Sequence, residues 1–150
     1  MDAKAVAWMD GLCGAVHGYR QAVNEAAKKG PQSEVATAKT IGESLGRYAE
    51  FAGKAVEELN AIGASSVPAG ETARKSFVDK FTKARDTAAD GKAKLAAAKA
   101  GDSKALDAAI EAMNAAQTAV SDAVDPVSPI VGSPELSAAA ATAPKCKPAS

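Results

Sequence analysis

Hydrophobic residues recur three and four positions apart through most of the chain, which is the spacing of one face of an α-helix. In the segment 2–29 this apolar face consists of Ala5, Met9, Leu12, Val16, Tyr19, Val23 and Ala26. The same spacing continues through 33–62, 71–100 and 103–124. The pattern therefore predicts four helices that cover these four ranges.

Glycine and proline residues separate the predicted helices. Gly63 lies where a C-terminal cap of the second helix belongs, the segment 64–70 is typical of a loop, and Asp125 with Pro126 is expected to end the fourth helix. Short connections make neighbouring helices antiparallel. The sequence thus predicts an all-α fold, an antiparallel up-down four-helix bundle over 1–125.

The composition changes after residue 125, because five prolines occur among the last 25 residues. Within this tail, 126–150, Ser133 is followed by a first-turn proline and a first-turn acid, which predicts a short helix from Pro134 to about Ala143. In an up-down bundle the fourth helix ends where the first begins. The tail is therefore expected to pack back on the first helix, within one domain overall.

The chain contains two cysteines, Cys13 in the first predicted helix and Cys146 in the tail. An even number of cysteines, placed where the topology lets them meet, predicts a disulfide and an oxidising compartment. Closing a loop of this length contributes about 4–5 kcal/mol in the chain-entropy model. Two alternatives stay open, namely two free buried thiols in a cytosolic protein, or a reactive thiol at Cys13.

Alanine accounts for 38 of the 150 residues, whereas the chain has three Phe, two Tyr and one Trp. Such a core is thin, and a covalent link would help to hold it. The formal net charge is zero, which gives no reason to expect nucleic acid as a partner. No apolar run approaches the length of a transmembrane helix, and the N-terminus shows no signal-peptide pattern. The chain is therefore expected to be either cytosolic or a mature domain whose export signal has been removed, and the two cysteines favour the second interpretation.

Three residues on one face of the first helix, Asp10, Cys13 and His17, could ligate zinc or form a thiol–imidazole pair. A haem site would use His17 with Met9 or Met113. The chain has one His, and we find no phosphate-binding loop or nucleophile motif. The sequence therefore predicts no enzyme activity, no cofactor and no metal, with the Asp10–Cys13–His17 set as the alternative to the disulfide.

Large aromatic side chains mark a possible ligand pocket between the helices. Its expected lining is Trp8, Tyr19, Tyr48, Phe77 and Phe81. A cavity there would favour a carrier of a small apolar ligand, whereas an exposed apolar patch would favour a protein partner. Trp8 is expected to pack under the short C-terminal helix near Leu136. Gly42, Gly46 and Gly53, inside the second helix, are expected to let a neighbouring backbone come close.

Two stretches carry a resemblance to known proteins. They are Ala-Trp-Met-Asp-Gly-Leu-Cys-Gly-Ala-Val at 7–16 and Gly-Ser-Pro-Glu-Leu-Ser-Ala-Ala-Ala-Ala-Thr-Ala-Pro-Lys-Cys at 132–146. In this combination the chain resembles small Ala-rich exported proteins and lipoproteins of high-GC Gram-positive (actinobacterial) type. The resemblance implies a place in the cell envelope or outside the cell, with a possible lipid anchor upstream.

Together these observations predict a non-enzymatic, exported helical module that binds a protein partner or a small apolar ligand. The alternative is a carrier that holds an apolar ligand, haem or a metal between its helices.

Overall fold

The computed structural model describes residues 2–29, 37–99, 101–121 and 124–147. Within these ranges the chain is all-α, because 88% of the residues are helical and none lies in a strand. The helices of this part are α1 (Ala3–Lys29), α2 (Ala38–Ala61), α3 (Pro68–Ala97), α4 (Ser103–Ser121), α5 (Val124–Val131), α6 (Pro134–Thr142) and the short 3₁₀ helix η1 (Pro144–Cys146). The predicted fold class is confirmed at this level.

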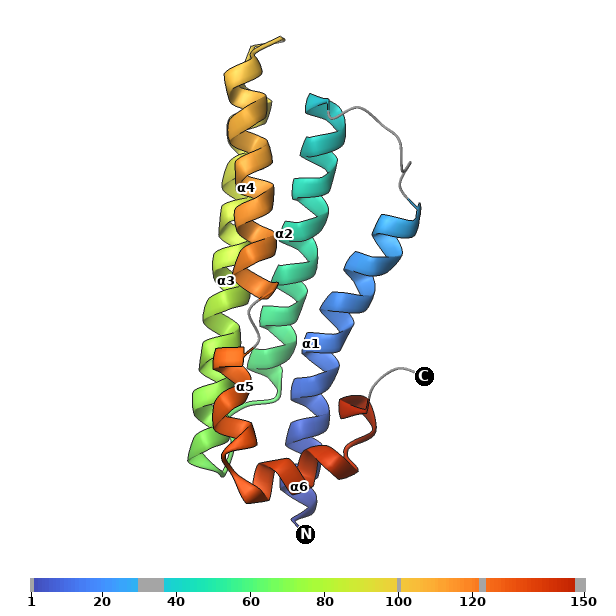
Figure 1. Cartoon of the computed structure of the whole chain (residues 1–150), viewed down its shortest axis with the longest axis vertical. Coiled ribbons are helices and arrows are strands. Elements are labelled where there is room, and N and C mark those ends of the chain that lie inside the picture. Colours follow the sequence, from blue (N-terminus) through green and yellow to red (C-terminus); the bar gives the residue numbers. More distant parts are fainter. Residues whose placement is uncertain (1, 30–36, 100, 122–123, 148–150) are drawn as a thin grey trace.

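Each long helix packs against its neighbour in the sequence, α1 on α2, α2 on α3 and α3 on α4. The helix α5 packs against α3, and α6 crosses the end of the molecule where α1 begins (Figure 1). There α6 and η1 both contact α1, so the C-terminal segment returns to the first helix.

The core combines a few large side chains with many alanines. Met9, Leu45, Leu59 and Leu136 are the largest fully buried side chains. The buried alanines include Ala52, Ala73, Ala88, Ala109, Ala116 and Ala139. Within the described residues no polar or charged residue is buried, so the core is formed by apolar side chains.

Local signals account for most helix boundaries. The N-cap of α2 is Thr37, whose hydroxyl accepts a hydrogen bond from the Thr40 backbone (3.2 Å), while the Thr40 hydroxyl accepts one from the Thr37 backbone (2.9 Å). The earlier start predicted for this helix falls on 33–36, outside the described residues. The helix α3 begins at Pro68, before the predicted residue 71, because proline suits the first helical position.

One boundary prediction is wrong. The helix α4 ends at Ser121, and a further helix, α5, runs through the position where Asp125 and Pro126 were expected to stop helical structure. Pro126 stands in the first turn of α5, where a missing backbone N–H costs no intrahelical bond. Pro129 lies inside α5, and the packing of α5 against α3 outweighs its low helix propensity.

The predicted tail helix is present as α6. Ser133 caps it, because its hydroxyl accepts a hydrogen bond from the Leu136 backbone at 3.4 Å. Leu136, Ala139 and Ala143 are fully buried. The tail is therefore an integral part of the core rather than a loose extension.

Candidate functional site

A disulfide joins Cys13 of α1 to Cys146 of η1, as predicted, across 133 residues of sequence and with 5.0 Å between the two Cα atoms. Neither cysteine is free, which contradicts the alternatives of two free thiols or a reactive Cys13. Next to the disulfide, the Lys145 backbone N–H donates a hydrogen bond to Asp10 Oδ1 at 2.8 Å. The tail is thus attached to α1 by a covalent bond and a charge-assisted hydrogen bond.

Two glycines of α1 leave room for these neighbours. A Cβ on Gly14 would lie 2.9 Å from Cδ of Lys145, whose side chain crosses the helix at this point. A Cβ on Gly11 would collide with Ile62 at the end of α2. Gly14 and Gly11 therefore serve the close approach of the tail and of α2, respectively.

The metal alternative loses its ligands in this arrangement. The thiol of Cys13 is consumed by the disulfide, and Asp10 Oδ1 accepts the hydrogen bond from Lys145. His17 is half-buried on the same helix. Across the described ranges, no group of three His, Cys, Asp or Glu side chains is placed to hold a metal ion.

Four of the five predicted pocket residues lie near one another, Tyr19 on α1, Tyr48 on α2, and Phe77 and Phe81 on α3. The rings of Tyr19 and Phe81 meet edge to face with centroids 4.9 Å apart, and Phe77 stacks on Phe81 at 6.4 Å. Tyr48 joins them, and its hydroxyl accepts a hydrogen bond from Gln117 Nε2 at 2.5 Å. The rings of Tyr19 and Phe77 both pack on Phe81, and all three residues are buried.

The electrostatics of Tyr19 reflect this packing. Burial in the cluster, with a smaller effect from Tyr48, raises the pKa of the Tyr19 hydroxyl to about 12. The neutral phenol is therefore the stable form over the physiological range. The cluster links α1 to α3 through aromatic contact.

Trp8, the fifth predicted pocket residue, lies elsewhere. Its Nε1–H donates a hydrogen bond to the Gly63 carbonyl at 3.0 Å, and a Cβ added at Gly70 would lie 3.2 Å from its ring. Gly63 ends α2 with a φ of 72°, in the left-handed region that favours glycine. Trp8 therefore contacts the segment 63–70, which comprises the connection between α2 and α3 and the first residues of α3.

A carboxylate organises the same connection. Glu71 accepts a hydrogen bond from the Ser65 backbone N–H at 3.1 Å and pairs with Arg74 one turn further along α3. The hydrogen bond from Arg74 is the main cause that lowers the pKa of Glu71, and the Ser65 N–H adds to it. The role of this site is structural, because Glu71 connects Ser65 of the loop to Arg74 of α3.

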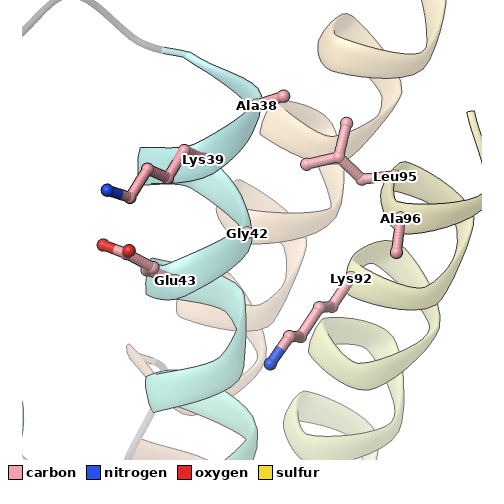
Figure 2. Close-up of a pocket in the computed structure, with 7 residues that line it drawn as sticks. All are labelled: Ala38, Lys39, Gly42, Glu43, Lys92, Leu95 and Ala96. Carbon is pink, nitrogen blue, oxygen red and sulfur yellow. The ribbon is translucent and has the colours of Figure 1, made fainter. Parts of the chain in front are cut away.

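An open groove of about 380 Å³ lies between the N-terminal part of α2 and the C-terminal part of α3 (Figure 2). Its lining is Ala38, Lys39, Gly42, Glu43, Lys92, Leu95 and Ala96. Figure 2 shows Leu95 and Lys92 reaching from α3 toward α2, whereas Lys39 and Glu43 project from α2 away from α3. None of the five aromatic residues predicted as a pocket belongs to this groove.

The interior glycines of α2 explain how the groove is shaped. A Cβ on Gly42 would lie 3.8 Å from Cδ2 of Leu95, and a Cβ on Gly46 would lie 2.9 Å from Nζ of Lys92. Further along α2, a Cβ on Gly53 would lie 3.4 Å from Cδ of Arg85, which is another long side chain of α3. The glycines therefore receive long side chains of α3, where the sequence had suggested a neighbouring backbone.

Sequence reasoning missed the groove, although its signal was present in those glycines.

No helix in the described ranges is both long enough and apolar enough to span a membrane. No protein-family model matches the chain, and neither does a curated protein or a solved structure.

Proposed function

We propose that this protein is an exported, non-enzymatic binding module of the cell envelope or the extracellular space, built as an antiparallel up-down four-helix bundle. The observation that carries the proposal is the Cys13–Cys146 disulfide, because such bonds form and persist in oxidising compartments. The pairing of each long helix with its sequence neighbour supports the bundle topology.

The groove between α2 and α3 supports a binding role. Its volume of about 380 Å³ lies within the roughly 300–1,000 Å³ range of small-molecule sites. Its lining combines apolar side chains with the Lys92 ammonium. Catalytic groups typically show strongly perturbed pKa values inside a cleft. Tyr19 and Glu71, whose pKa values are shifted, lie outside the groove.

The alternative, a carrier that holds an apolar ligand, haem or a metal among the predicted aromatic residues between the helices, is less well supported. It would place a ligand among aromatic rings of which three, Tyr19, Phe77 and Phe81, already contact one another and are buried. The proposal includes a lipid anchor upstream of this chain, because the two cysteine-bearing stretches of the chain resemble exported lipoproteins.

Thiol labelling on intact cells of the source organism tests the export. Cells are treated with a membrane-impermeant maleimide, with and without prior treatment with a membrane-impermeant phosphine, and the protein is weighed by mass spectrometry. We expect two labels after reduction and none without it. Labelling without reductant, or only after lysis, would contradict an exported disulfide. A variant with serine at both Cys13 and Cys146 gives the zero-label control.

Native mass spectrometry of protein purified from the same cells tests the binding role. The expected spectrum contains the intact chain together with a bound small molecule or partner. A spectrum that shows only the bare chain under non-denaturing conditions would contradict a binding module. The labelling result does not depend on this measurement, so location and binding are judged separately.

A further inference from the structure

The groove between α2 and α3 has an apolar floor. Ala38 and Gly42 from α2 and Leu95 and Ala96 from α3 contribute it, and all four belong to helical segments. The backbone N–H and C=O groups inside a helix are occupied by its own hydrogen bonds. The floor therefore presents methyl and methylene groups, which recognise alkyl surface.

One positive charge enters the groove from α3. Lys92 reaches toward α2 in Figure 2, and among the described residues it forms no ion pair. By contrast, Lys94 two positions later is paired with Asp90 at 3.0 Å. Lys39 and Glu43 carry opposite charges and project away from α3. The charge directed at a groove occupant is therefore the Lys92 ammonium, which is complementary to an anion.

The size of the groove decides between a small molecule and a protein helix. A stable protein partner needs about 800 Å² of buried surface on each side, and a groove lined by seven residues offers far less. A volume of about 380 Å³ suits a small ligand that is only partly enclosed. An alkyl chain between two helices meets this geometry, because it can follow the helix direction.

We propose that the α2–α3 groove binds one single-chain fatty acid, with its alkyl chain on the floor and its carboxylate at the Lys92 ammonium. This assignment rests on the binding role proposed above and names the ligand class. Ion pairing at an exposed lysine gives a modest gain, and burial of the alkyl chain supplies most of the affinity.

Calorimetry with dodecanoate below its micelle concentration tests the assignment. We expect binding at one site per chain, weakened about five-fold by Lys92→Gln, the upper range for an exposed ion pair. The matched control is Lys94→Gln, which removes a lysine of the same helix that does not line the groove and leaves the affinity unchanged. Equal affinity for dodecyltrimethylammonium, with its cationic head, would overturn the role of Lys92.

A second variant tests the floor. Gly42→Leu fills the groove, and its Cβ meets Leu95 at an ordinary 3.8 Å, so the fold should accept it. We expect dodecanoate affinity to fall by about ten-fold or more, because methylene contacts are lost. The control is Gly18→Leu on α1, where a Cβ would have nothing within 4 Å. Unchanged affinity in a folded Gly42→Leu protein would overturn the assignment.

The outcomes separate this assignment from the broader proposal. Binding to anionic phospholipid vesicles without binding to dodecanoate would overturn the fatty acid and indicate a membrane surface instead. Failure of dodecanoate to bind, while native mass spectrometry shows another bound molecule, would overturn the ligand class and leave the binding role intact. Failure of both measurements would overturn both proposals.

Discussion

The two ends of this molecule are held together in different ways. At the tail-closed end, where α6 and η1 return to α1, the large side chains of Trp8, Met9, Leu12 and Leu136 are buried, and the disulfide links α1 to the tail. At the opposite end, where α2 begins and α3 ends, alanine and glycine pack beside a few large side chains such as Ile41 and Leu45. We call this second region the small-residue end, defined by Gly42, Ala88, Gly91, Ala109 and Ala112.

The difference shows two solutions for a chain so rich in alanine. Large side chains remove more apolar surface from water, at about 25 cal/mol per Å², and the tail-closed end gathers them under a covalent clasp. Small residues bury less area but let helices approach closely, as Gly91 does against Ala112 of α4. The groove lies at the small-residue end, because the side chains there do not fill the space between α2 and α3.

The largest expected effect comes from opening the clasp. Cys13→Ser removes the disulfide, and we expect a loss of about 4–5 kcal/mol of unfolding free energy, the chain-entropy value for a loop above one hundred residues. The helical circular dichroism at low temperature should remain, because Leu136, Ala139 and Ala143 still bury the tail. Thermal and denaturant unfolding measure the loss.

The wild-type protein in strong reductant provides the control for this variant. Its melting temperature should match that of Cys13→Ser, because both lack the covalent link. An unchanged melting temperature in Cys13→Ser would mean that the apolar contacts of the tail alone hold the tail-closed end. The contrast between the two ends would then be one of side-chain size only.

The small-residue end is tested by adding a single methyl group. In Gly91→Ala the new Cβ would lie 2.7 Å from Cβ of Ala112, so α3 and α4 must move apart. Overpacking costs about 1–3 kcal/mol, against a gain of about 1 kcal/mol in helix propensity. We expect a net loss of up to about 2 kcal/mol in chemical denaturation.

Two companion variants identify the cause of that loss. Gly18→Ala adds the same methyl group on α1, where nothing lies within 4 Å, and should stabilise the protein by up to about 1 kcal/mol. In the Gly91→Ala background, Ala112→Gly should recover part of the loss, because it removes the clashing atom. Stabilisation by Gly91→Ala alone would show that the helices at this end are not closely packed.

The sequence predicted the tail-closed end better than the small-residue end. Two cysteines, together with the Ser-Pro-Glu start of a helix, are local signals, and they correctly predicted the disulfide and α6. Helix periodicity likewise placed the long helices to within a few residues. The helix α5 was missed because its prolines, judged by local propensity, argue against a helix that packing on α3 permits.

The candidate site was harder to predict for a physical reason. Aromatic residues are conspicuous in a sequence, yet Tyr19, Phe77 and Phe81 pack against one another and do not line the groove. The groove instead depends on two features: Gly42 has no side chain, and α3 has a particular rotation about its axis relative to α2. Helix rotation is set by all contacts together, so no local pattern specifies it.

A smaller effect is expected from the hydrogen bond of Trp8 at the tail-closed end. Trp8→Phe keeps an aromatic ring but removes the donor to the Gly63 carbonyl, and we expect a loss of about 1 kcal/mol. Amide hydrogen exchange of the 63–70 connection should rise in this variant. An unaffected connection, with the same unfolding free energy as wild type, would show that the ring alone matters.

The smallest effect concerns Glu71, which holds the same connection by polar contacts alone. The hydrogen bond from Arg74 lowers its pKa below the ordinary value of 4.5, so the folded state favours the carboxylate more than the unfolded state does. Its stabilising contribution is therefore present above about pH 4.5 and disappears as the pH falls through the lower folded pKa. Glu71→Gln should be less stable than wild type at neutral pH, and the difference should vanish in acid.

Glu57→Gln removes an exposed carboxylate of α2 and serves as the matched charge control in urea titrations across pH. A deficit of Glu71→Gln that stays constant down to pH 2 would contradict the role of the ionised carboxylate and assign the effect to side-chain shape.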